Sequence, residues 1–184
     1  MSQLLAYRQL DIVRVPHYGE DLRVTTSVYE TNSLFGCRNT CIYDADNKPC
    51  YTSWGIGAFV NHTTGRLQKL PEEVQHTLKL DPAVEMEYTE RRIVLPQEEF
   101  TLMPDIEVSR NDIDYNCHVN NAEYLRMAVG MLPQDFEVKR LRVEYKIAAK
   151  QGDVLTPKIL AKDNMFYVVL YLDTHISTIF QFSE

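Results

Sequence analysis

Two turns of the same kind divide the sequence into halves that follow one plan. YGED (18–21) and KQGD (150–153) each join two segments of strand character, and two more such segments follow in each half. The segments are 4–15, 22–30, 34–44 and 50–61 in the first half, and 139–148, 153–162, 164–173 and 175–183 in the second. Alternating segments joined by short turns are typical of antiparallel sheets, so we predict a degenerate repeat whose first half is mostly an antiparallel meander.

The second half also carries, ahead of this plan, a strand and a helix that the first half lacks. Residues 100–110 have strand character, and residues 119–132 place apolar side chains at helical spacing. Asn120, followed three residues later by Glu123, predicts a capping box at the start of this helix, and Pro133 predicts its end.

The stretch between the halves is polar, contains prolines and predicts a linker with at most a short helix near 71–78. We therefore expect a partial N-terminal unit (1–70), a linker (71–99) and a C-terminal unit (100–184). A five-stranded antiparallel sheet needs a cover for its apolar face, and one central helix is the simplest cover. The predicted class is α+β, with tandem hotdog folds of which the N-terminal one is truncated, because Met1 stands where its first strand and helix would be.

Composition and charge exclude several classes of protein. The formal net charge of -7 argues against general nucleic-acid binding, which needs clustered Lys and Arg. No apolar run is long enough to cross a bilayer, and the first residues lack the pattern of a secretory signal. The four cysteines have no metal-type spacing, so we expect reduced thiols in a cytoplasmic protein without a metal site.

The stretch DYNCHVNNAEY (114–124) is the best candidate for a functional site. If it is extended, Asp114, Asn116 and His118 face one way, and the following helix points its free N–H groups back toward them. A carbonyl oxygen placed there could accept from a backbone N–H and from the Asn116 amide, as a developing oxyanion does. His118 could then donate or carry a proton, and Asp114 could orient His118 or a water, which suits attack on an ester or thioester. An isolated Asp-x-Asn-x-His is, however, more often turn and capping chemistry.

The longer phrase resembles the Asp-x-Asn-x-His-Val-Asn-Asn-x-x-Tyr signature of the acyl-ACP thioesterases, the double-hotdog enzymes of plants and bacteria. SWGIGAFVNHTTGRLQKLPEEV (53–74) is similar to the Trp-containing strand and Leu-Pro segment of that family, and IVRVPHYGEDLRVTT (12–26) to its strand and turn after the first helix. The resemblance implies hydrolysis of fatty acyl thioesters on acyl carrier protein, with Asp114, Asn116 and His118 at catalytic positions and no cofactor. The residues expected to contact substrate are Asn120, Asn121, Tyr124 and Trp54, although for Trp54 core packing is the favoured interpretation and a pocket wall the alternative.

Two departures from the family pattern bear on activity. The family carries an acidic residue in a Tyr-x-x-Glu pattern on the strand after the helix, and Ala148 stands at that position here. Glu144 lies four residues earlier, roughly 13 Å away along a strand, and is a poor substitute. The first strand and helix of the family are also missing. Either the chain is a truncated or diverged member of the family or a partner covers the bare sheet, and an exposed sheet face would favour a homodimer.

The segment 138–150 alternates apolar with charged residues and predicts a solvated strand face. On an otherwise acidic enzyme it is also the best local basic surface for an acidic carrier protein. The residues predicted to dock the carrier are Lys139, Arg140, Arg142 and Lys146.

The sequence is also compatible with two other functions. One is a hotdog hydrolase that acts on acyl-CoA, and the other is a non-catalytic acyl-binding remnant of the enzyme. Ala148 and the absent first helix favour the remnant.

Overall fold

A computed structural model describes residues 2–61 and 64–184 and divides the chain into two compact units. The first unit runs to Arg91 and the second from Arg92 to Glu184, so the boundary falls inside the stretch expected to be a linker. None of the helices in the described ranges is long and apolar enough to cross a membrane.

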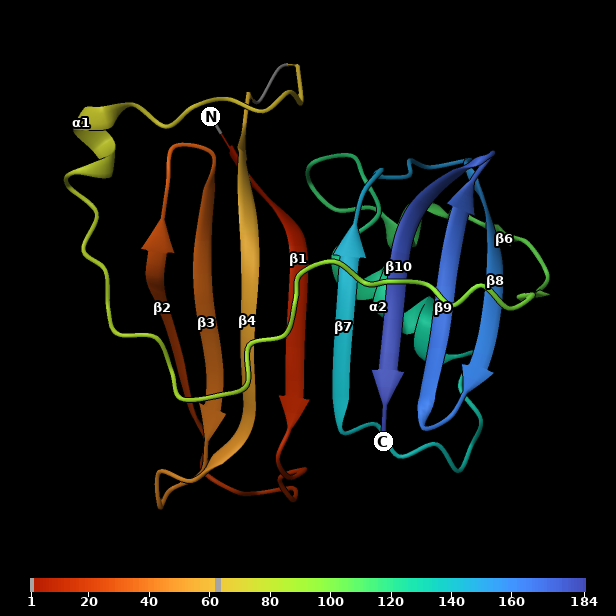
Figure 1. The fold of residues 1–184 in the computed structure, drawn as a ribbon, viewed down its shortest axis with the longest axis horizontal. Helices are drawn as coiled ribbons and strands as arrows, with labels where there is room; N and C mark the ends of the chain where they lie inside the picture. The colour runs from red at the N-terminus through yellow and green to blue at the C-terminus, as the bar shows by residue number, and fades with distance from the viewer. Residues whose placement is uncertain (1, 62–63) are drawn as a thin grey trace. The chain divides into compact units, whose positions relative to one another are not determined.

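The first unit contains one antiparallel sheet (Figure 1). Its strands are β1 (Ser2–Ile12), β2 (Arg23–Thr31), β3 (Phe35–Tyr43) and β4 (Pro49–Val60), and its helix is the single turn α1 (Glu72–Gln75). The predicted meander is correct for β2, β3 and β4, but β1 pairs with β4 and not with β2. Residues 13–22 between β1 and β2 are numerous enough to cross the end of the sheet, since an extended chain spans more than 3 Å per residue.

The second unit repeats this pairing pattern. Its elements are β5 (Thr101–Leu102), β6 (Ile106–Glu107), the 3₁₀ turn η1 (Arg110–Asp112), α2 (Asn121–Val129), β7 (Arg140–Tyr145), β8 (Val154–Lys162), β9 (Met165–Leu172) and β10 (His175–Ser183). β8, β9 and β10 form a meander and β7 pairs with β10, as β1 does with β4. Gly19 and Gly152, in the two related turns, have φ of 89° and 86°, a conformation that favours glycine.

The single strand predicted at 100–110 is wrong in detail, because two short strands, β5 and β6, pair separately with β8. Pro104 lies between them and has no N–H to give to a ladder, which explains the interruption.

Helix α2 is shorter than predicted, and its capping differs. Asn120 caps it through its side chain, which accepts from the Ala122 N–H at 2.9 Å. The reciprocal half of the expected capping box is absent, because the Asn120 N–H donates to the Asp112 carbonyl at 2.8 Å and the Glu123 carboxylate binds Arg126 at 2.5 Å. The helix ends at Val129, followed by Gly130, before Pro133 is reached.

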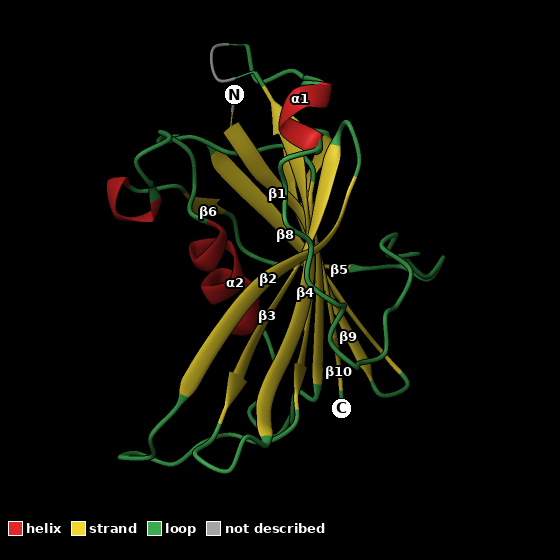
Figure 2. Ribbon diagram, turned by 90° about the vertical axis from the view of Figure 1, so that its left-hand side faces the viewer, coloured by secondary structure: helices red, strands yellow, loops and turns green. Residues whose placement is uncertain are grey.

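One face of the second sheet packs against α2 (Figure 2). The contact is aromatic: the Tyr124 and Tyr145 ring centroids lie 6.1 Å apart, and those of Tyr145 and Phe180 lie 6.4 Å apart. Phe180 is fully buried and stacks on Phe182 at 6.0 Å. This is the helix cover that the apolar alternation of the second half predicts.

The opposite face of the second sheet is covered by the start of the unit. Ile93 is buried against Tyr167, Val169 and Ile179. The stretch that the sequence indicates to be a linker therefore contributes to the core here.

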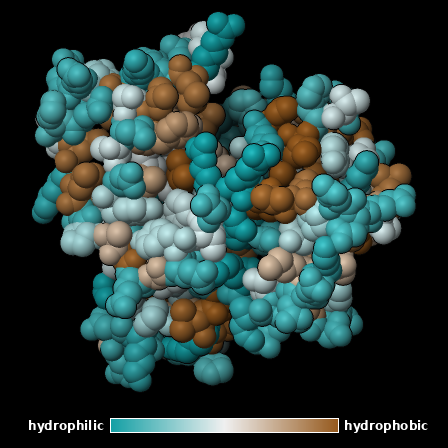
Figure 3. Space-filling view, viewed as in Figure 1, coloured by the Kyte–Doolittle hydropathy of each residue, from teal (hydrophilic) through white to brown (hydrophobic). Residues whose placement is uncertain are grey.

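On the side of the molecule seen in Figure 3, apolar residues form separate patches among polar ones.

In the first unit, residues 84–89 cross the sheet and are held by buried amide side chains; we call these residues the strap. Gln9 is fully buried, and its Oε1 accepts from the Trp54 indole N–H at 2.9 Å and from the Thr89 hydroxyl at 2.7 Å. Its Nε2 donates to the Glu87 carbonyl at 2.7 Å. Asn39 accepts from the Val84 N–H at 3.1 Å. These bonds fix the strap along one face of the sheet.

The loop after β1 carries a charge network that makes stability depend on pH. Arg14 Nη2 lies 2.6 Å from a Glu20 oxygen and 3.0 Å from an Asp44 oxygen. The hydrogen bond from Arg14 and that from the His17 N–H lower the pKa of Glu20 from 4.5 to about 2. Because the folded value is the lower one, Glu20 stabilises the fold above about pH 4.5 and loses this effect as the pH falls toward 2.

We therefore expect Glu20→Gln to lower the urea midpoint near neutral pH. The difference in urea midpoint between the variant and the wild-type protein should shrink steadily below about pH 4.5, because the carboxylate is protonated first in the unfolded chain. Urea unfolding at a series of pH values measures this difference. A difference that stays constant down to about pH 3 would contradict the stabilising role of the ionised Glu20 carboxylate.

Candidate active site

Asp114 to His118 form a tight turn and not the extended segment that we predicted. The Asp114 N–H donates to the His118 carbonyl at 2.9 Å, and the Cys117 N–H donates to the Asp114 carbonyl at 3.1 Å. The flanking residues Ile113 and Val119 form an isolated antiparallel β-bridge. Cys117 has φ of 61°, which reverses the chain. Asp and Asn stabilise such turns through their own side chains, and here this outweighs extension.

Within the turn, the Asp114 carboxylate holds Asn116. One oxygen accepts from the Asn116 backbone N–H at 2.8 Å and the other from its side-chain Nδ2 at 3.2 Å. An amide nitrogen carries two N–H bonds, so one donor of Asn116 remains for a ligand. The carboxylate thus orients the amide, whereas the sequence suggested that it would orient His118 or a water.

His118 is half-buried at the end of the turn. Within residues 2–61 and 64–184, no hydrogen bond or ion pair engages its imidazole. Asn116, two residues before it in the turn, is exposed. No described residue therefore occupies either ring nitrogen of His118.

The first turn of α2 contributes one further donor. The N–H groups of Ala122 and Glu123 donate to Asn120, the latter at 2.9 Å to its carbonyl. The Asn121 N–H has no acceptor in the part of the chain that the structure describes, and its side chain is exposed. Donors at a helix N-terminus favour negative charge. Asn120 therefore serves as a cap, and Asn121 supplies an unused N–H.

Asp112, which the sequence analysis missed, anchors the turn from below. It is 5% exposed, and its carboxylate accepts from the Ser109 N–H at 2.8 Å, the Ser109 hydroxyl at 2.7 Å and Arg126 at 3.1 Å. Burial alone would raise the pKa of Asp112, but the bonds from Ser109 and Arg126 outweigh it and hold the pKa below the ordinary value. The signal available in the sequence is the Ser-x-x-Asp spacing of Ser109 and Asp112, which is a capping pattern.

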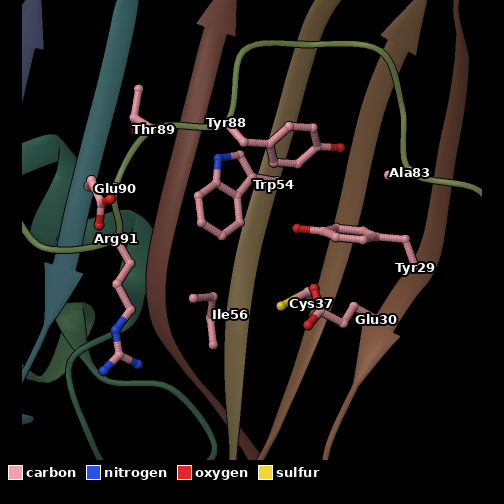
Figure 4. A pocket seen from close by; sticks show the side chains of 10 residues that line it. All are labelled: Tyr29, Glu30, Cys37, Trp54, Ile56, Ala83, Tyr88, Thr89, Glu90 and Arg91. Carbon is pink, nitrogen blue, oxygen red and sulfur yellow. The ribbon is translucent and has the colours of Figure 1, made fainter.

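Two residues expected to contact substrate lie inside the units. Tyr124 is 2% exposed, and its hydroxyl accepts from the Ala149 N–H at 2.7 Å, so it joins α2 to the segment after β7. Trp54 packs on Tyr7 with ring centroids 4.9 Å apart. It also lines a pocket of about 520 Å³ in the first unit, beside Tyr29 and Arg91 (Figure 4). Both interpretations of Trp54, core packing and pocket wall, therefore describe its position.

No free carboxylate stands at the family's acidic position. Ala148 is exposed, and the nearby Glu144 carboxylate accepts from the Ile93 N–H and from Lys146 at 2.6 Å. Glu144 is thus occupied by structural bonds, which agrees with its poor spacing.

The basic side chains predicted to dock the carrier, on and beside β7, interact with neighbouring residues. Lys139 lies 3.3 Å from Glu137, and Lys146 lies 2.6 Å from Glu144. Arg142 donates to the Gln181 side chain at 2.5 Å, and Arg140 is half-buried. The two lysines are the more exposed members of the set.

The two units and the turn before α2 define a protein of the tandem hotdog type. Residues 4–78 match the model of the acyl-ACP thioesterase N-terminal domain, and residues 96–176 match that of the acyl-ACP thioesterase C-terminal domain. The chain belongs to the acyl-ACP thioesterase family.

Sequence relatives agree. The chain is 26% identical over 157 residues to a chloroplastic acyl-acyl carrier protein hydrolase of Cuphea viscosissima, a match that covers 80% of this chain. It is 25% identical over 162 residues, 83% of this chain, to a chloroplastic palmitoyl-acyl carrier protein thioesterase of Cuphea hookeriana. The matches span only 38% and 39% of these relatives' lengths.

Solved structures show the same fold. An acyl-ACP thioesterase from Bacteroides thetaiotaomicron superposes with a TM-score of 0.84 at 20% identity, covering 99% of this chain and 76% of that one. A 12:0-ACP thioesterase from Umbellularia californica gives 0.87 at 16% identity, covering 99% of this chain and 74% of that one. The predicted α+β class and tandem hotdog architecture are confirmed.

Proposed function

We propose that this chain is a thioester hydrolase that releases fatty acids from acyl-acyl carrier protein in fatty acid biosynthesis. Family membership supports the reaction class. The observation that supports the proposal is the turn before α2, where Asp114 holds the Asn116 amide and where the imidazole of His118, two residues further on, is engaged by no described residue.

The reaction follows from these groups. The thioester carbonyl oxygen would accept from the free N–H of Asn116 and from the Asn121 N–H, which stabilise negative charge as water adds to the carbonyl carbon. His118 would take a proton from that water and return it to the leaving sulfur. The C–S bond breaks, leaving a fatty acid and the carrier thiol. No step needs a metal or organic cofactor.

Docking of the carrier would use the basic side chains on and beside β7. Lys139 and Lys146 are exposed, and each forms an ion pair with one neighbouring glutamate. The expected cytoplasmic location and the expected homodimer stay predictions; the curated relatives cited above are chloroplastic by name.

The test is release of free thiol from acyl carrier protein loaded with a single fatty acid, followed with a thiol-reactive dye. We expect catalysed release from the carrier, and slower release from the CoA ester of the same acid. A clear preference for CoA would support an acyl-CoA thioesterase. Equal rates with and without the protein would support the acyl-binding remnant, which the exposed Ala148 and the engaged Glu144 favour.

A further inference from the structure

Asp112 links three separate pieces of the chain around the turn. Its carboxylate binds Ser109, ahead of η1, through two hydrogen bonds, and binds Arg126 on the second turn of α2. Its backbone carbonyl accepts from the N–H of the cap residue Asn120 at 2.8 Å. The bridge between Ile113 and Val119 then closes the turn that begins at the next residue.

We propose that Asp112 is the positioning residue of the active site, and that it sets the turn carrying Asn116 and His118 against the N-terminus of α2. The proposal rests on the function proposed above. Asp112 need not touch substrate. It fixes the distance between the two donors, on Asn116 and Asn121, that a developing oxyanion would require.

A carboxylate suits this position because every group directed at it is a donor. One oxygen accepts from the Ser109 N–H and hydroxyl, and the other accepts from Arg126. An asparagine amide has only one acceptor oxygen, so in either orientation its NH₂ group would face a donor. The low pKa of Asp112 keeps the carboxylate ionised and able to accept all three bonds.

The first experiment compares the steady-state kinetics of Asp112→Asn with those of the wild-type protein on acyl carrier protein thioester. Misplacement of a reacting group by about 1 Å can cost roughly 100-fold, so we expect kcat to fall by about that factor while KM stays within about twofold. The matched control is Glu123→Gln, which removes the other carboxylate on Arg126, one that is less buried than Asp112. Its kcat should stay within about twofold of wild type.

A second variant tests the mechanism of the loss. When Asp112→Asn is combined with Arg126→Gln, the side-chain oxygen of the introduced glutamine can accept from the introduced asparagine amide, which removes the clash between two donors. We expect this double variant to recover about tenfold of the lost kcat. A purely structural role predicts no recovery, because the double variant also lacks the ion pair.

Hydrogen exchange of the turn separates this inference from the proposed function. Exchange of the amides of residues 113–120, followed by mass spectrometry, should accelerate at least tenfold in Asp112→Asn and stay unchanged in Glu123→Gln. A wild-type protein without hydrolysis would refute the function and leave this readout intact. Unchanged exchange, or equal kcat in Asp112→Asn and wild type, would overturn the positioning role.

Discussion

Replacing His118 by alanine is expected to lower kcat/KM for acyl carrier protein thioester by a factor of roughly 10²–10⁴, the usual contribution of a positioned acid–base group. The imidazole has no hydrogen bond to any described residue, so its loss should leave folding intact. The turn is held by the backbone bond between the Asp114 N–H and the His118 carbonyl, which alanine also provides. Thiol release and the thermal midpoint should be measured on the same preparation.

The control for this prediction is His175→Ala. His175 is exposed at the start of β10, and its ring Nδ1 lies 3.4 Å from the Thr174 hydroxyl. We expect its kcat/KM to remain within about twofold of wild type. Equal losses in both variants, or no loss in His118→Ala, would remove the imidazole from the mechanism.

The second large effect is on stability: Gln9→Leu should lower the free energy of unfolding by about 3–5 kcal/mol. The variant leaves the buried Trp54 indole N–H, and the N–H and hydroxyl of the half-buried Thr89, without their common acceptor. Each buried donor left unpaired costs about 1–3 kcal/mol, and the effects are not additive. A domain of ordinary stability would lose a large fraction of its margin.

Urea unfolding measures this loss, and Trp54, the single tryptophan of the chain, reports it by fluorescence. The matched control is Gln3→Leu on the same strand. Gln3 is exposed and donates one bond, to the Gly57 carbonyl at 3.3 Å. It should shift the free energy by no more than about 0.5 kcal/mol. If both variants unfold at the same urea concentration, the strap is not held by Gln9.

The strands could be predicted because their signals are local. Alternation of apolar and polar residues marks each segment, and Gly19 and Gly152 mark the two related turns. Strand pairing is not local. β1 pairs with β4, which is distant in the sequence, and no residue pattern at the end of β1 indicates that pairing. The same holds for Gln9 and Asn39, whose burial depends on a strap some eighty and forty-five residues away.

The sequence indicates the residues of the candidate site but not their geometry. The motif contains Asp114, Asn116 and His118. In an extended segment these three side chains would lie on one face. The positive φ of Cys117 and the bonds from Asn116 to Asp114 produce a turn instead. The Ser-x-x-Asp spacing could have marked Asp112 as part of a cap, but its bond to Arg126, fourteen residues further on, follows from no local pattern.

The central claim is that a thioester carbonyl binds between the Asn116 amide and the Asn121 N–H. The most direct test is titration of ¹⁵N-labelled protein with a non-hydrolysable ketone analogue of the acyl carrier protein thioester, followed by amide resonances. We predict that the Asn116 side-chain and Asn121 backbone signals shift together and saturate at one ligand concentration. Saturable binding that leaves both signals unmoved would contradict the account.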